Sequence, residues 1–120
     1  MKIIIFDDEL GSEMQMYLAL SHRHEVEIAQ DPHDLLTLLE ENAADLTFID
    51  LGLCKGEVHT MNAFELTEQI KKKHPKIKVV GIIDQENDQL KEEAANLGIP
   101  AVITRPIRNR ELLRVVENSD

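Results

Sequence analysis

The chain has 120 residues, a formal net charge of −10, 42% hydrophobic residues and 30% charged residues. This balance argues against disorder and is typical of one globular domain, residues 1–120, that needs no disulfide or structural metal. The acidic charge disfavours direct binding of nucleic acid or anionic lipid. Cys54 is the only cysteine and no apolar run could span a bilayer, so we expect a cytoplasmic protein without a membrane partner.

Apolar runs alternate with segments of helical periodicity along the whole chain. The runs are short and rich in Ile, Val and Phe, which predicts strands buried on both faces of a sheet. The predicted strands are residues 2–6, 26–29, 45–50, 77–83 and 101–104. The predicted helices are residues 10–20, 32–42, 62–73, 87–97 and 109–117. Five strand–helix pairs in strict alternation predict an α/β fold with a parallel sheet, right-handed crossovers and helices on both faces.

The first predicted helix carries its apolar residues at helical spacing, namely Leu10, Met14, Tyr17 and Leu18. Met14 and Met16 are expected to pack in this region of the core. Gly98 follows the fourth predicted helix and is expected to be its C′ residue.

Carboxylates stand where the first and third predicted strands end. Asp7 and Asp8 follow the first strand, and Asp50 ends the third. If these strands are neighbours, the three carboxylates converge at the edge where ligands of open α/β folds bind. Their mutual repulsion calls for a cation, and oxygen ligands suit a hard ion such as Mg²⁺. The alternative is that Asp7 and Asp8 cap the first helix, but the same ending on two strands favours a site.

A metal ion beside a carboxylate indicates phosphoryl chemistry. Asp50 would be the nucleophile and would form an aspartyl phosphate. The chain has no Walker loop and no Gly-rich dinucleotide turn, so the phosphoryl donor is expected to be something other than a nucleotide bound here. Cys54 and His59, in the following loop, are interpreted as neither nucleophile nor metal ligands.

Several motifs stand in a fixed order from Ile3 to Glu117: Asp7-Asp8, Asp50, Asn62 to Leu66, Leu97-Gly98 and Arg105-Pro106. In this order and spacing they resemble the receiver domains of two-component response regulators. The resemblance implies a flavodoxin-like fold, a doubly wound five-stranded parallel sheet with strand order 2-1-3-4-5. It also implies a non-enzymatic module of phosphorelay signalling, with a histidine kinase or phosphotransfer protein upstream and a protein target downstream.

The same resemblance implies the residues of the site. Asp50 would be the phosphoacceptor, and Mg²⁺ would be held by Asp7, Asp8, Asp50 and a loop carbonyl, that of Gly52. Arg105 stands where receivers carry a lysine that contacts the phosphoryl group. Arginine keeps the positive charge and binds phosphate bidentately, but its longer, planar group changes the geometry.

The positions that normally sense phosphate also depart from the family. Ile83 stands in place of the switch Ser/Thr, and Val102 in place of the switch aromatic residue. The usual two-state element is therefore missing. Asp84 would repel a phosphoryl group if it pointed inward. The loop after Asp50 is longer than usual, and its residues 52–60 are a candidate output route.

Two alternative functions remain open. A pseudo-receiver would use the same fold for protein–protein contact without phosphorylation. A small phosphatase acting through an aspartyl phosphate is disfavoured, because Gly52, two residues after Asp50, offers no general acid. The oligomeric state is open as well, and the exposed faces of the fourth and fifth helices are candidate homodimer surfaces.

Overall fold

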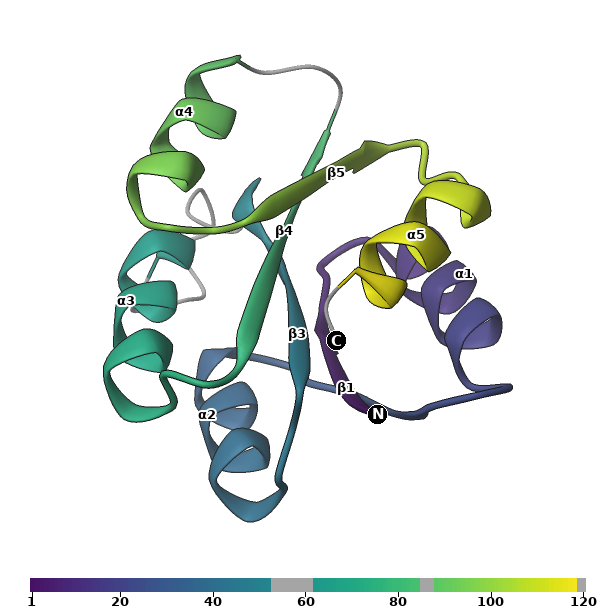
Figure 1. The fold of residues 1–120 in the computed structure, drawn as a ribbon, viewed down its shortest axis with the longest axis horizontal. Helices are drawn as coiled ribbons and strands as arrows, with labels where there is room; N and C mark the ends of the chain where they lie inside the picture. The colour runs from purple at the N-terminus through teal and green to yellow at the C-terminus, as the bar shows by residue number, and fades with distance from the viewer. Residues whose placement is uncertain (53–61, 85–87, 119–120) are drawn as a thin grey trace.

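The computed structural model describes residues 1–52, 62–84 and 88–118, which form five strands and five helices in strict alternation (Figure 1). The strands are β1 (Lys2–Phe6), β2 (Glu25–Ile28), β3 (Leu46–Asp50), β4 (Lys78–Asp84) and β5 (Ala101–Arg105). The helices are α1 (Leu10–Leu20), α2 (Pro32–Glu41), α3 (Ala63–Lys73), α4 (Asp88–Asn96) and α5 (Asn109–Glu117).

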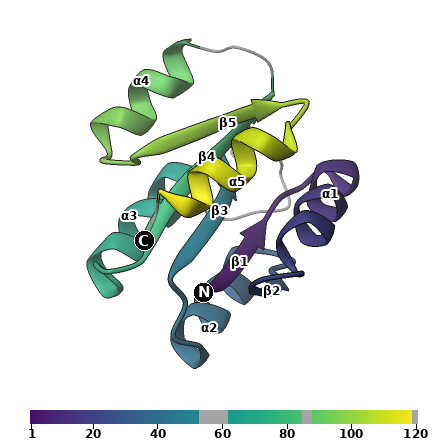
Figure 2. The ribbon, with the colours of Figure 1, turned by 45° about the vertical axis from the view of Figure 1, so that its right-hand side comes forward.

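All strand pairs are parallel, and the sheet has the order β2-β1-β3-β4-β5, which confirms the predicted flavodoxin-like topology (Figure 2). β1 and β3 are neighbours, as convergence of their carboxylates requires. Phe6 pairs with Ile49 in this register. The next residues therefore lie side by side: Asp7 directly follows β1, and Asp50 is the last residue of β3.

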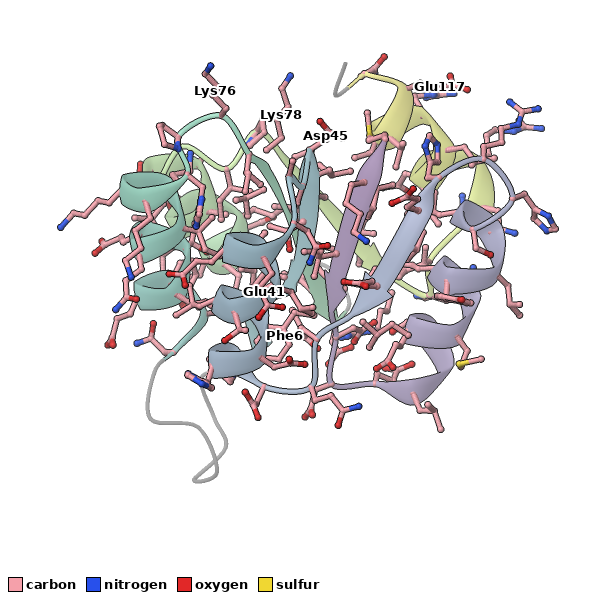
Figure 3. All side chains as sticks on the ribbon, turned by 90° about the horizontal axis from the view of Figure 1, so that it is seen from below. Phe6, Glu41, Asp45, Lys76, Lys78 and Glu117 are labelled. Carbon is pink, nitrogen blue, oxygen red and sulfur yellow. The ribbon has the colours of Figure 1, made fainter. Side chains whose placement is uncertain are left out.

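Helices cover both faces of the sheet, with α2, α3 and α4 on one face and α1 and α5 on the other (Figures 1 and 3). Successive side chains of a strand point to opposite faces. Ile3 and Ile5 therefore pack under α1 and α5, while Ile4 and Phe6 pack under α2, α3 and α4. Figure 3 shows Asp45 and Lys78 at one end of the strands and Phe6 at the other, near the site described below.

Most predicted element boundaries agree with the structure within one or two residues. Asn62 caps α3 rather than opening it, since its side chain accepts a hydrogen bond from the backbone N–H of Glu65 at 2.8 Å. Gly98 has a φ of +79°, the left-handed conformation expected of a C′ residue. β4 and β5 each continue one residue further than predicted, to Asp84 and Arg105. The predicted start of the fourth helix at Asn87 lies outside the described residues.

The inner face of α1 differs from the one that hydrophobicity suggests. Its apolar residues Leu10, Met14 and Leu18 are 71%, 43% and 59% exposed, whereas Ser12, Met16 and Leu20 are buried. The predicted packing of Met16 is confirmed, and that of Met14 is wrong. The two rows are offset by two residues, about 200° around the helix. Ser12 faces inward because its hydroxyl group bonds at the site.

Neither Asp7 nor Asp8 is the N-cap of α1. That position belongs to Glu9, whose side chain makes no capping hydrogen bond. None of the described helices is both long and apolar enough to cross a membrane.

Gly81 lies in β4 where a side chain has no room. A Cβ atom there would stand 2.6 Å from Cδ1 and 3.1 Å from Cγ of Leu51, a fully buried residue. We expect Gly81→Ala to lower the free energy of unfolding by about 1–3 kcal/mol, as overpacking does. The matched control is Gly11→Ala in α1, where the nearest atom is 3.6 Å away. Because alanine favours a helix, this control should raise stability by about 0.5–1 kcal/mol in the same urea titration. Equal effects of the two changes would contradict this account of the core.

Candidate functional site

The ends of β1 and β3 place two acidic side chains together at the carboxyl edge of the sheet. Asp7 and Asp50 are buried, with only 5% and 4% of their surfaces exposed. A buried carboxylate is costly unless a cation or hydrogen-bond donors compensate it. The compensating group is the side chain of Arg105, which reaches in from the end of β5 and is itself 8% exposed.

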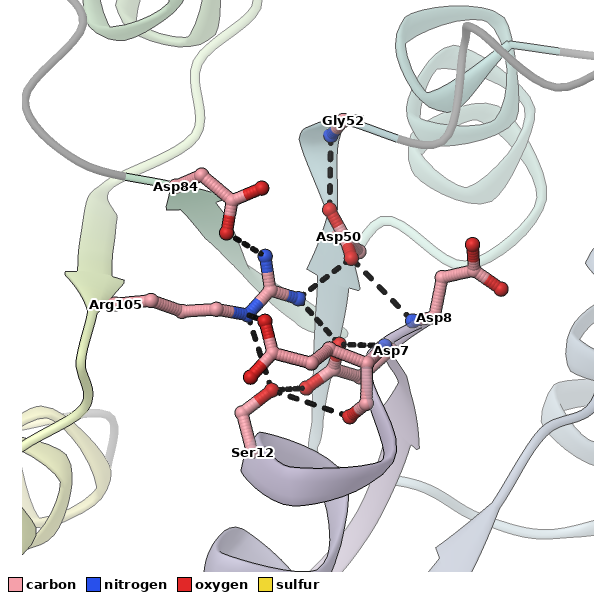
Figure 4. Close-up of polar contacts among 8 residues, drawn as sticks. Asp7, Asp8, Ser12, Asp50, Gly52, Asp84 and Arg105 are labelled. Carbon is pink, nitrogen blue, oxygen red and sulfur yellow. Dashed lines mark hydrogen bonds and ion pairs between the residues drawn. The ribbon is translucent and has the colours of Figure 1, made fainter.

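The guanidinium of Arg105 uses all three of its nitrogen atoms (Figure 4). Nη2 donates to Oδ2 of Asp50 at 2.6 Å and also to Oδ1 of Asp7. Nη1 donates to Oδ1 of Asp84 at 2.7 Å. Nε donates to Oγ of Ser12 at 3.0 Å. We call these five residues the Arg105 network. It joins the ends of four strands and the first turn of α1.

Asp7 is held on both of its carboxylate oxygen atoms. Oδ1 accepts the backbone N–H of Glu9 at 2.9 Å as well as the guanidinium, and Oδ2 accepts the hydroxyl group of Ser12. Burial raises the pKa of Asp7, and these donors and the charge of Arg105 oppose that rise without cancelling it. The carboxylate of Glu9 lies 3.3 Å from Nε of Arg105 and is more exposed.

Asp50 is also bonded on both oxygen atoms. Oδ1 accepts the backbone N–H of Gly52 at 2.9 Å, and Oδ2 accepts Arg105 together with a longer bond from the N–H of Asp8, 3.3 Å. The carboxylate is therefore oriented by backbone groups on one side and by a cation on the other.

Arg105 remains a cation despite its burial. Burial lowers its pKa, but the hydrogen bonds to Asp50 and Asp84 and the charges of Asp50 and Asp7 outweigh that effect, and the pKa rises above its ordinary value. From the sequence, Asp84 is expected to repel a phosphoryl group if its side chain points inward. In the structure its carboxylate points at the guanidinium of Arg105 and forms an ion pair with it.

A small open cleft of about 150 Å³ lies against the network, and we call it the edge cleft. It is lined by Asp8, Glu9, Asp50, Gly52, Asp84 and Arg105. Four acidic residues and one cationic residue thus line the edge cleft. The cleft gives access to Asp50 from solvent, whereas Asp7 is not part of its lining.

The predicted Mg²⁺ ligands divide into two groups. Asp8, Asp50 and Gly52 line the edge cleft, but the oxygen atoms of Asp7 are already bonded to Arg105, Ser12 and Glu9. The carboxylate of Asp8 points away from the guanidinium in Figure 4. Within the described residues, no three His, Cys, Asp or Glu side chains are placed to hold a metal ion by themselves. Mg²⁺ needs only one or two carboxylates because it keeps several waters, so two carboxylates and the Gly52 carbonyl suit it chemically.

The two positions that we expect to correspond to the family's switch residues carry apolar side chains. Ile83 is fully buried, and Val102 packs against the same cluster. Neither side chain can hydrogen-bond a phosphoryl group. Gly52 is the last described residue before the candidate output loop. The rest of that loop, which includes Cys54 and His59, lies outside the described residues.

Sequence reasoning missed Ser12 and the partnership of Asp84 with Arg105. A serine in the first turns of a helix carries no pattern of its own. Asp84 and Arg105 are register partners on β4 and β5, but this pairing appears only when both strands are extended by one residue. The convergence of Asp7 and Asp50, by contrast, followed from the order of the strands.

Comparison with known proteins identifies the family of this chain. A flavodoxin-like sheet with buried acidic residues at its carboxyl edge defines a receiver-like domain. The sequence matches the response regulator receiver domain family over residues 3–117, and the chain belongs to that family. Its members act in two-component signal transduction, interact with histidine kinases and downstream effectors, and are generally not enzymes. None of the curated proteins matches the sequence.

Solved structures show the same likeness. The receiver domain of NtrX from Brucella abortus is 28% identical with a TM-score of 0.89, and the match covers 98% of this chain and 96% of that one. NtrX from Brucella abortus in complex with ADP gives the same identity and TM-score, but this chain spans only 26% of its length. A CheY-like receiver domain protein from Methanospirillum hungatei JF-1, at 24% identity, 98% and 90% coverage and a TM-score of 0.82, shares the fold.

The network gives Arg105 a structural role. Arg105→Ala leaves Asp7 and Asp50 buried without their cation, and we expect it to lower the free energy of unfolding by about 3–5 kcal/mol. Arg108→Ala is the matched control, because Arg108 is exposed and makes no side-chain capping bond at the start of α5. It should change stability little. Chemical denaturation measures both, and an Arg105→Ala protein as stable as the control would show that the network does not stabilise the fold.

Proposed function

We propose that this chain accepts a phosphoryl group on Asp50 from a histidine kinase or phosphotransfer protein and passes the signal to a downstream protein target. The observation that carries the proposal is the setting of Asp50. Its carboxylate is oriented by the Gly52 N–H and a guanidinium 2.6 Å away, at the floor of a cleft open to solvent. Preorganised donors of this kind stabilise the charge that develops during phosphoryl transfer.

The proposed reaction begins when an oxygen atom of Asp50 attacks the phosphorus atom of a phosphoramidate donor such as phosphohistidine. The new P–O bond forms as the P–N bond breaks, and the donor nitrogen keeps the electron pair of the broken bond. Arg105 stays protonated and neutralises oxygen atoms of the transferring group. Asp7 and Ser12 hold the guanidinium in place for this role.

Mg²⁺ is the proposed cofactor, with Asp8, Asp50 and the carbonyl of Gly52 as its direct protein ligands. Asp7 contributes to the negative potential that attracts the ion, because its oxygen atoms are bonded elsewhere. A bound Mg²⁺ supplies further charge neutralisation of phosphoryl oxygens. The other proposed properties are a single domain over residues 1–120, a cytoplasmic location and no binding of nucleic acid or membranes.

The pseudo-receiver is the second candidate function, and two observations favour it. Arg105 already compensates Asp7 and Asp50 within the protein, and the sensing positions carry Ile83 and Val102. A domain of this kind would bind its partner protein whether or not Asp50 is phosphorylated.

Incubation with phosphoramidate separates the two functions. In the presence of Mg²⁺, we expect intact-mass spectrometry to show one added phosphoryl group on the wild-type protein, sensitive to hydroxylamine as an acyl phosphate is. Asp50→Asn should abolish the added mass because it removes the nucleophile, and chelation of Mg²⁺ should strongly reduce it.

The matched control is Asp88→Asn, which changes an exposed acidic residue at the start of α4 and should be phosphorylated like the wild type. An unmodified wild-type protein would leave the pseudo-receiver as the better description. Modification that persists in Asp50→Asn would place the acceptor elsewhere.

A further inference from the structure

We propose that Arg105 is a positioning residue that transmits the state of Asp50 to Asp84, at the end of β4. The guanidinium holds both carboxylates in the unmodified protein and releases Asp84 when Asp50 carries a phosphoryl group. This inference rests on the proposed function, since it describes how that same site is read out.

The geometry places the two carboxylates on different nitrogen atoms of one rigid group. Nη2 donates to Asp50 at 2.6 Å and Nη1 donates to Asp84 at 2.7 Å. Asp84 and Arg105 are register partners on β4 and β5, so their side chains start next to each other. The planar guanidinium therefore spans from the buried end of β3 to the exposed end of β4 (Figure 4).

A lysine would make this connection less well. Its three N–H donors radiate from one nitrogen atom, so that single atom would have to reach both carboxylates, whereas the guanidinium holds five N–H donors on three nitrogen atoms in a fixed plane. An arginine at position 105 therefore lets Nη2 bind Asp50 while Nη1 binds Asp84. In the same protein, the two positions expected to sense phosphate carry apolar side chains: Ile83 is fully buried, and Val102 is half-buried against the same core cluster.

Asp84 is the partner that the guanidinium can lose at least cost. The side chains of Asp7 and Asp50 are 0% and 6% exposed, so without Arg105 each would be a buried negative charge with no cation to compensate it. The side chain of Asp84 is 73% exposed, so water replaces the lost contact.

Phosphorylation favours that loss for two reasons. A phosphoryl group replaces one negative charge at Asp50 by about two and adds oxygen acceptors that pair bidentately with arginine. The group would also enter the edge cleft, which Asp84 lines, and the two anions repel each other. Nη1 then turns from Asp84 to a phosphoryl oxygen, Nη2 keeps Asp7 while it also contacts the phosphoryl group, and the Asp84 carboxylate becomes free.

The result is a two-state element with different contacts in each state, which is what a ligand needs to shift a conformational equilibrium. The unmodified state has an Asp84 carboxylate paired with Arg105 at the end of β4. The phosphorylated state has an unpaired acidic group there, available to the basic group of a protein target.

NMR with beryllofluoride and Mg²⁺, as a stand-in for the phosphoryl group, tests the link. In the wild-type protein we expect the backbone amide signals of Gly52 and Asp84 both to shift. Arg105→Lys keeps a cation beside Asp50 but removes the pair of Nη groups that bind Asp50 and Asp84 at the same time. In this variant the Gly52 signal should still shift, whereas the Asp84 signal should shift much less than in the wild type, because only the direct repulsion by the bound group remains. An equal Asp84 shift in Arg105→Lys would overturn the proposal.

Affinity gives an independent measurement. Asp84→Asn removes both the competing partner and the repelling charge, so beryllofluoride should bind about two- to fivefold tighter. Asp88→Asn, the matched control, should bind like the wild type. If Asp84→Asn binds no tighter than Asp88→Asn, the proposal is wrong, and this comparison decides the matter even if Arg105→Lys fails to fold.

If the proposed function is wrong, neither the wild type nor any variant should bind beryllofluoride. The coupling between Asp50 and Asp84 can then still be tested without a ligand by the substitution Asp50→Asn. This substitution should shift the Asp84 amide signal when residue 105 is arginine and leave it unmoved in the Arg105→Lys background. An Asp84 signal that does not shift when residue 105 is arginine would overturn the coupling.

Discussion

One buried cation organises the carboxyl edge of this protein. Arg105 is surrounded by Asp7, Asp50 and Asp84, and each of these residues ends or follows a different strand. Buried carboxylates are tolerated only when they are paired, so the strand ends must meet within reach of one guanidinium. The sheet brings them into register, and the ion pairs then hold that register at its most highly charged point.

Much of this arrangement is predictable from the sequence. Strict alternation of apolar runs and helical segments predicts a parallel sheet, because hydrophobic periodicity encodes strands and helices strongly. The order of the strands came from the resemblance to receiver domains, and that order makes β1 and β3 neighbours. Asp7 and Asp50 then lie together, because each directly follows or ends one of these strands.

The remaining features depend on side-chain direction, which a periodic pattern does not encode. Ser12 lies on the inner face of α1 although three apolar residues of the same helix lie outside. The hydroxyl group of Ser12 bonds both Asp7 and Arg105, and it thereby satisfies buried polar groups of the site, which a leucine at this position could not do. The contact between Arg105 and Asp84 was equally hidden, because it depends on one further residue of pairing between β4 and β5.

The orientation of α1 bears on how this sequence can vary. Leu10, Met14 and Leu18 are exposed and belong to neither core cluster, so the fold places few demands on them. Ser12, Met16 and Leu20, on the opposite side of the same helix, are constrained by the ion pairs and the core. We therefore expect proteins that share this core to vary more along the outer row of the helix than along the inner row.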